Sequence, residues 1–209
     1  VIDRNKSAVI AYDSRRFSKK FGKQTAKIFS ANNIKSYIFS DLRPTPELSF
    51  AVRELNCSCG IVITASHNPK EYNGYKVYWN DGGQITSPHD KNIISEVEKI
   101  TDFNQINFNY NSDLIEEIDT KIDKKYIKKI QDLSVYDNSK SKLKIIFSSL
   151  HGTGITQIPN ALNAFGFKNI SSVKSQEIPD PEFSTVNSPN PEDLDALDLG
   201  IKKLKKEKA

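Results

Sequence analysis

The chain has 209 residues, of which 37% are hydrophobic and 27% are charged, a balance typical of a soluble globular protein with one or two domains. Its net charge of +4 comes from 30 basic and 26 acidic side chains, which is too small an excess for a nucleic-acid partner. No stretch of the sequence approaches the roughly 18 consecutive apolar residues of a membrane span, so we expect no membrane partner.

The first 65 residues alternate between predicted strands and helices. Apolar runs predict three strands, at residues 7–14, 34–41 and 57–65. Apolar residues at helical spacing predict two helices, at residues 15–33 and 46–56. Thr45 is the expected N-cap of the second helix, with Pro46 at its first position. This alternation favours an α/β fold with mainly parallel mixed sheets sandwiched by helices.

The chain then adds one strand and two helices. An Asn-Gly turn precedes an alternating strand at residues 73–79. Helical patterns follow at residues 87–100, where Ser87 is the expected N-cap, and at residues 119–133. The polar stretch between them, residues 101–115, is interpreted as a loop or an edge element.

A second unit is expected after the linker-like segment YDNSKSK, which divides the chain into domains at 1–137 and 138–209. Strands are predicted at residues 143–150 and 169–175, with a helix at 155–167 that Gly166 closes. A proline-rich connection leads to a last helix at residues 190–208. Because this order repeats that of the first part, we predict two related domains, the second of which ends before its next strand.

The two cysteines, Cys57 and Cys59, are one residue apart in a predicted strand, where a disulfide between them would be strained. No further cysteine or histidine stands near them in the sequence to complete a metal site. We interpret both as reduced core thiols, which is typical of a cytoplasmic protein.

Polar residues follow the strand that ends near residue 65, where ligands gather in open parallel sheets. Ser66, His67 and Asn68 stand there, and a polar turn closed by proline would explain the same residues. Ser66 and His67 are adjacent in sequence and do not by themselves form a nucleophile–base pair. Since no G-x-S-x-G motif is present, serine hydrolase chemistry is poorly supported.

Two further polar features have alternative explanations. The segment HGTG at residues 151–154 follows a predicted strand, so its backbone N–H groups could cradle a phosphate at a helix start, although a tight turn explains it equally well. His89 stands beside the predicted Ser-Pro helix start, and we interpret it as a surface residue.

The segment TASHNPKEYNGYKVYW resembles the phosphoserine loop of the α-D-phosphohexomutase family, which includes phosphoglucomutases and phosphomannomutases. The family's other segments follow in the same order, namely AYDSR, RPTPEL, NDGGQITSPHD, LHGTG and PDPEFSTVNSPNPED. YKVYW and QITSPHDK are most similar to the type-2 branch, whose members act as phosphoglucomutases, phosphopentomutases or glucose-1,6-bisphosphate synthases.

The resemblance implies a role for six residues. Ser66 would carry the transferred phosphate, which would also be a ligand of Mg²⁺, with glucose 1,6-bisphosphate as activator. His67 would act beside it, and Lys76 would be the general acid–base. The residues implied to bind the substrate are Thr64, Asn68 and Arg15.

The resemblance also implies that much of the enzyme lies outside this chain. The family's Asp-rich metal loop, D-x-D-x-D-R, is absent, and the chain contains no methionine. We therefore expect this chain to be the N-terminal part of a larger enzyme, whose C-terminal domains and most of whose Mg²⁺ ligands lie outside these residues. We expect this part to be inactive alone.

The expected reaction interconverts glucose 1-phosphate and glucose 6-phosphate through a bisphosphate. The alternatives are a phosphopentomutase, a glucose-1,6-bisphosphate synthase, a catalytically silent relative that binds sugar phosphates, and a plain α/β binding domain with a polar turn.

Overall fold

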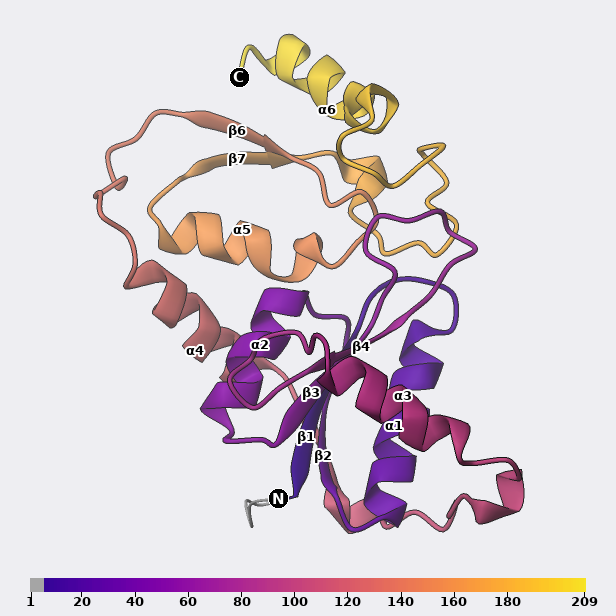
Figure 1. Cartoon of the computed structure of the whole chain (residues 1–209). Helices are drawn as coiled ribbons and strands as arrows, with labels where there is room; N and C mark the ends of the chain where they lie inside the picture. Colours follow the sequence, from indigo (N-terminus) through magenta and orange to yellow (C-terminus); the bar gives the residue numbers. More distant parts are fainter. Residues whose placement is uncertain (1–5) are drawn as a thin grey trace.

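Strands and helices alternate along most of the chain in the computed structural model, which describes residues 6–209 (Figure 1). The first sheet has the strand order β4-β3-β1-β2-β5, in which β4 is antiparallel to β3 and the other pairs are parallel. Its strands are β1 (Ser7–Tyr12), β2 (Lys35–Phe39), β3 (Cys59–Ile63), β4 (Tyr75–Tyr78) and β5 (Ile115–Ile118). The predicted α/β class with a mainly parallel mixed sheet is confirmed.

Helices cover both faces of this sheet, and they are α1 (Ser18–Ala31), α2 (Thr45–Glu54) and α4 (Thr120–Gln131). Val9 and Ala11 of β1 belong to the core cluster that contains residues of α2 and α4. Ile10 and Tyr12 belong to the other cluster, together with Ala26 of α1. Because β1 is buried on both faces, its sequence is an almost unbroken apolar run, and this run predicts the strand.

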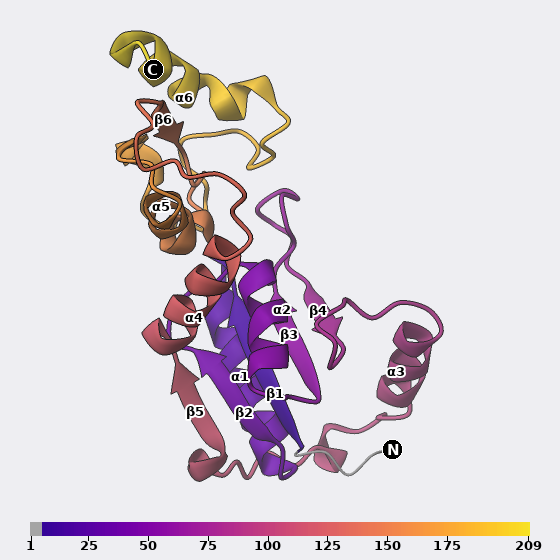
Figure 2. The ribbon, with the colours of Figure 1, turned by 90° about the vertical axis from the view of Figure 1, so that its left-hand side faces the viewer.

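The connection between β4 and α4 contains elements that lie away from this core. The helix α3 (His89–Glu98) has no buried residue, and Figure 2 shows it standing off beyond β4. Two short 3-10 helices follow, η1 (Phe103–Gln105) and η2 (Ser112–Leu114). His89 is exposed, as predicted, and its ring stacks on Trp79.

The second unit (residues 144–207) lies above the first in both views (Figures 1 and 2). It contains β6 (Lys144–Phe147), α5 (Gly154–Ala164), β7 (Asn169–Ser172), η3 (Lys174–Gln176) and α6 (Leu194–Glu207). Its two strands are parallel, and Gly166 follows α5 in the left-handed conformation (φ 97°), as predicted. The division of the chain at residue 137 stays a prediction.

Four expectations need correction. The N-cap position of α2 is Pro44 and not Thr45, and α3 begins at His89 with Pro88 before it, so Ser87 does not cap it. The edge strand β5 is missing from the prediction, because only Ile118 of its residues is buried. Cys57 lies before β3, although both cysteines are free thiols as expected.

A buried polar cluster joins the two units. Arg43 donates two hydrogen bonds to the carboxylate of Asp123, both at 2.9 Å, and Gln157 of α5 donates to Glu47 of α2 at 3.3 Å. Glu47 is fully buried, and one of its carboxyl oxygens has no hydrogen-bond partner. Burial, together with the neighbouring Asp123, raises the pKa of Glu47 to about 9. The contact between α2 and α5 therefore involves a protonated carboxyl at neutral pH.

Replacing Glu47 with glutamine is expected to flatten the pH dependence of stability. The folded-state pKa is raised from 4.5 to about 9, so the folded state binds more protons and the wild type loses stability as pH rises between these values. Between pH 5 and pH 8, E47Q should gain roughly 2–4 kcal/mol relative to the wild type.

Urea denaturation at each pH measures this difference. E54Q is the matched control, because Glu54 is a partly exposed acid of the same helix that forms an ion pair with Lys125. Parallel pH profiles for the wild type and E47Q would contradict a raised pKa at Glu47.

In residues 6–209, no helix has the length and apolar character needed to cross a lipid bilayer.

Candidate active site

The loops after β1 and β3 meet at the point where the strand order of the first sheet reverses. The chain passes from β1 to β2 on one side and then returns to place β3 on the other side of β1. The N–H of Asp13, just after β1, donates to the carbonyl of Ile63 at the end of β3. In open α/β sheets, ligands bind at such a switch point, outside the carboxyl ends of the strands.

The loop after β3, residues 64–73 (the Ser66 loop), presents its polar residues to solvent. Ser66, His67 and Asn68 are exposed, whereas Thr64 is buried. Ser66 has a φ of 58°, in the left-handed region that serine rarely adopts. Its N–H donates to Oγ1 of Thr64 at 2.9 Å, so the buried threonine supports the strained serine. Thr64 therefore helps to hold the loop, and its expected contact with the substrate stays a prediction.

Arg15 organises the Ser66 loop from behind. Its side chain is 1% exposed, and its guanidinium donates four hydrogen bonds to carbonyl oxygens of the loop, at 2.6–3.0 Å. The four acceptors are the carbonyls of Ser66, Asn68, Pro69 and Tyr72. Its Nε lies 3.3 Å from Asp13, whose carboxylate opposes the lowering of the Arg15 pKa that burial causes. These contacts make Arg15 a positioning residue for the loop, and its expected contact with the substrate stays a prediction.

Lys76 lies on the antiparallel strand β4, which follows the Ser66 loop along the chain. The N–H of Thr64 donates to the carbonyl of Gly74, which closes the Ser66 loop at its base. A Cβ at Gly74 would lie 2.7 Å from the carbonyl oxygen of Thr64, so glycine permits this close approach. Lys76 pairs with Val62 and is half-buried. Within residues 6–209 its ammonium makes no hydrogen bond or ion pair, which leaves it available to a ligand.

Neither His67 nor His151 forms a short hydrogen bond with Ser66, and a catalytic role for His67 stays a prediction. Oγ of Ser66 lies 3.5 Å from Nδ1 of His67, at the outer limit of a hydrogen bond. His151 of the HGTG segment is buried, and its two ring nitrogens contact the carbonyl of Ile178 and the hydroxyl of Thr185. The HGTG segment is a tight turn with a fully engaged histidine.

The fit of this chain to Mg²⁺ is incomplete. No group of three or more His, Cys, Asp or Glu side chains that could hold a metal ion occurs in the described part of the chain, residues 6–209. A phosphate on Ser66 would supply one ligand only. These residues therefore do not form a magnesium site by themselves.

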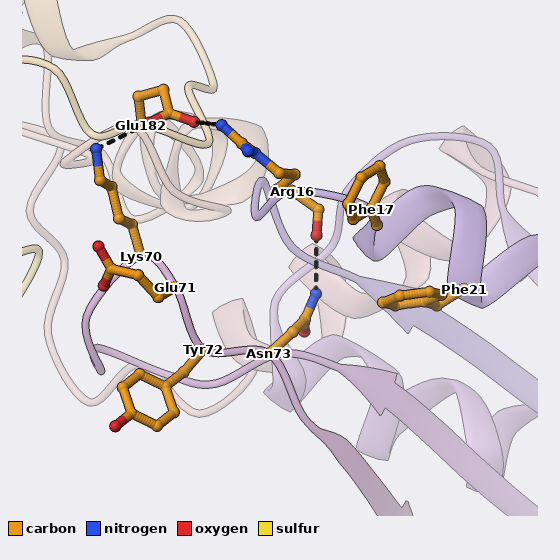
Figure 3. A pocket seen from close by; sticks show the side chains of 8 residues that line it. All are labelled: Arg16, Phe17, Phe21, Lys70, Glu71, Tyr72, Asn73 and Glu182. Atoms are coloured by element: carbon orange, nitrogen blue, oxygen red, sulfur yellow. Dashed lines mark hydrogen bonds and ion pairs between the residues drawn. The ribbon is translucent and has the colours of Figure 1, made fainter.

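A cavity of about 590 Å³ lies beside the Ser66 loop (Figure 3). Its lining comes from the start of α1, from residues 70–73 of the Ser66 loop and from the second unit. The lining residues are Arg16, Phe17, Phe21, Lys70, Glu71, Tyr72, Asn73 and Glu182. Figure 3 shows Glu182 between Arg16 and Lys70. The sequence does not predict Glu182 as a residue of this region, because it lies 112 residues from Lys70 along the chain.

Comparisons with known proteins decide the family. The model of phosphoglucomutase/phosphomannomutase α/β/α domain I matches residues 2–104, and the model of domain II matches residues 124–209. The chain belongs to the phosphoglucomutase/phosphomannomutase family. The predicted resemblance and the two related domain types are thereby confirmed.

Two curated members of the phosphoglucomutase/phosphomannomutase family illustrate the similarity. A phosphoglucomutase of Staphylococcus haemolyticus is 41% identical over 94% of this chain and 36% of its own length. A human glucose 1,6-bisphosphate synthase is 39% identical over 96% of this chain and 34% of its own length. The chain thus spans about a third of the curated relatives that it matches.

A solved structure agrees with the fold. A phosphoglucomutase/phosphomannomutase family protein of Burkholderia thailandensis superposes with a TM-score of 0.76 at 20% identity, over 98% of this chain and 43% of that protein. At this identity the likeness concerns the fold, which confirms the α/β architecture of both units.

Proposed function

We propose that this chain is the N-terminal part of a phosphosugar mutase that moves a phosphoryl group between the 1- and 6-hydroxyls of a hexose. The reaction interconverts glucose 1-phosphate and glucose 6-phosphate through a phosphoserine at Ser66. The observation that carries the proposal is the exposed Ser66, held in a left-handed conformation at the switch point of the sheet by a backbone that Arg15 fixes. The similarity to phosphoglucomutases supports the choice of substrate.

The proposed chemistry consists of two direct transfers. In the first, the bond between phosphorus and Oγ of Ser66 breaks as a bond from phosphorus to a sugar hydroxyl forms, which yields a sugar bisphosphate. The intermediate then turns over in the site. In the second transfer, the bond between its other phosphorus and the sugar oxygen breaks as a bond from that phosphorus to Oγ of Ser66 forms. A covalent intermediate divides one intramolecular migration into two transfers that the same site can perform. Positioning and neutralisation of charge supply most of the catalysis in such reactions.

The residues of this chain divide between chemistry and support. Lys76 is proposed to exchange a proton with the reacting sugar hydroxyl and to place positive charge beside the transferred group. His67 and Asn68, exposed beside Ser66, are proposed to contact the phosphate or the sugar. Arg15 and Thr64 are proposed to act through the loop that they hold, and a contact of either residue with the substrate stays a prediction.

Other components belong to the proposal as well. Mg²⁺ would be held by the phosphate on Ser66 together with ligands outside residues 1–209, and glucose 1,6-bisphosphate would load the serine. The partners are sugar phosphates and the remaining domains of the enzyme, in the cytoplasm. Domain 1 would end near residue 137 and domain 2 would follow from residue 138.

A second candidate function is glucose-1,6-bisphosphate synthesis, which the 39% identity to the human synthase favours. In that case the bisphosphate would leave the site as product, and a separate phosphoryl donor would have to phosphorylate Ser66 again. A phosphopentomutase is the third alternative, with a pentose phosphate as substrate.

Steady-state assays of the complete enzyme with glucose 1-phosphate and ribose 1-phosphate test the proposal. We expect glucose 6-phosphate as the main product, with the higher kcat/KM for the hexose. The isolated chain of 209 residues should show no turnover, because it lacks most of the expected magnesium ligands. Release of bisphosphate as the main product would favour the synthase, and a higher kcat/KM for ribose 1-phosphate would favour the pentomutase.

A further inference from the structure

The second unit contains a turn whose shape is fixed by one aspartate. Asp180 accepts hydrogen bonds from the N–H groups of Glu182 and Ser184, both at 2.9 Å, and from the hydroxyl of Ser184. The bonds from Ser184 hold the pKa of Asp180 down to about 2. Phe183, at the centre of the turn, has a φ of 50°. The turn thus holds two neighbouring side chains, Glu182 and Phe183, in a defined arrangement.

Both side chains contact the first unit. Glu182 contacts Lys70 and Arg16, and Phe183 contacts Arg15. The carboxylate of Glu182 accepts a hydrogen bond from Nζ of Lys70 at 2.8 Å and forms an ion pair with Arg16 (Figure 3). Lys70 belongs to the Ser66 loop. The ring of Phe183 is 95% buried and lies 5.4 Å from the guanidinium carbon of Arg15, which is a cation–π distance.

The turn is also anchored within its own unit. The ring of His151 contacts Oγ1 of Thr185 at 2.8 Å, and the amide of Gln176 donates to the same oxygen at 3.0 Å. His151 and Gln176 are both buried. A displacement of the Ser66 loop relative to Glu182 would therefore have to break the ion pairs, because the turn cannot follow the loop alone.

We propose that Glu182 is a positioning residue that fixes the Ser66 loop to the second unit by bridging Lys70 and Arg16. This inference rests on the proposed function for its catalytic meaning, but the physical link itself is independent of the reaction. Glu182 neutralises the charges of Lys70 and Arg16 and holds the part of the Ser66 loop that contains Lys70. Arg15 holds the same loop through its carbonyl oxygens, and Phe183 packs against Arg15. Removing the charge of Glu182 breaks the link between Lys70 and the second unit and leaves the hydrogen bonds of Arg15 to the loop in place.

Hydrogen–deuterium exchange of the 209-residue chain tests the link. We expect E182Q to raise the exchange rate of the loop peptide that contains residues 67–73 by about tenfold, the factor that two cooperating exposed ion pairs can provide. K70M should also raise this exchange rate. The effect of the double variant should be smaller than the sum of the two single effects, because both substitutions remove the same ion pair. E182D should retain most of the protection, because the long side chains of Lys70 and Arg16 can follow a shortened carboxylate.

The control variant is E177Q, since Glu177 pairs with Lys174 inside the second unit and contacts no residue of the Ser66 loop. Its loop peptide should exchange at the wild-type rate. Wild-type exchange in E182Q would overturn the proposal, as would equal changes in E182Q and E177Q.

In the complete enzyme, E182Q should lower kcat about tenfold while KM changes less than twofold, and E182D should restore kcat. Faster loop exchange with an unchanged kcat would overturn the proposal that Glu182 positions the Ser66 loop for the reaction. If Ser66 takes up no phosphate even in the wild type, the proposed function fails, while the exchange experiment still decides the link between Glu182 and the loop.

Discussion

Replacing Arg15 with methionine is expected to destabilise the chain by about 3–5 kcal/mol, because it leaves the carboxylate of Asp13 without its buried cation. The same change leaves four loop carbonyls without their donor. Arg15→Lys should recover only part of this loss, since a single ammonium cannot reproduce the fork that reaches all four carbonyls. Urea denaturation at neutral pH measures the free energy of unfolding.

The matched control is Arg16→Met, which removes the next arginine in the sequence. Arg16 is 64% exposed and forms an ion pair at the surface, so its loss should cost no more than about 1 kcal/mol. Equal destabilisation by the two substitutions would contradict the assignment of Arg15 as the centre of the loop.

Replacing Ser66 with alanine is expected to abolish phosphoryl transfer in the complete enzyme, because the proposed covalent intermediate forms on Oγ of Ser66. The loss should exceed about 10⁴-fold in kcat, as for removal of a nucleophile in other covalent enzymes. Coupled assays of glucose 6-phosphate formation measure the rate.

Two further variants separate chemistry from structure. Ser66→Gly suits the φ of 58° and should be equally inactive without backbone strain. Ser95→Ala removes an exposed serine of α3 and should retain wild-type activity. Residual turnover of Ser66→Gly at more than a hundredth of the wild-type rate would show that another group carries the phosphate.

The fold was predictable where burial leaves a clear pattern in the sequence. The strands β1 and β3 are buried on both faces, so each is an apolar run. Strand β5 lies at the edge of the sheet with two exposed glutamates, and an edge strand of this kind lacks such a run. The N-cap of α2 was misplaced because Pro44 takes that position without a side-chain hydrogen bond.

The sequence predicts the residues of the site's motif, but it does not predict the residues that hold the Ser66 loop in place. Ser66 and Lys76 stand in a segment whose order of residue types is specific, so the resemblance finds them. The role of Arg15 depends on where four carbonyl oxygens point, which no pattern of side chains specifies. Glu182 is far from the loop in sequence and meets it only through the packing of the two units.

The central claim is that Ser66 carries a phosphoryl group, and the mass of one tryptic peptide tests it most directly. The peptide is ELNCSCGIVITASHNPK, residues 54–70, taken from the complete enzyme purified without phosphatase treatment and fragmented to place any modification. We predict phosphate on Ser66 and none on Ser58 or Thr64. A Ser66 that is unmodified, and stays unmodified after incubation with glucose 1,6-bisphosphate and Mg²⁺, would contradict the account.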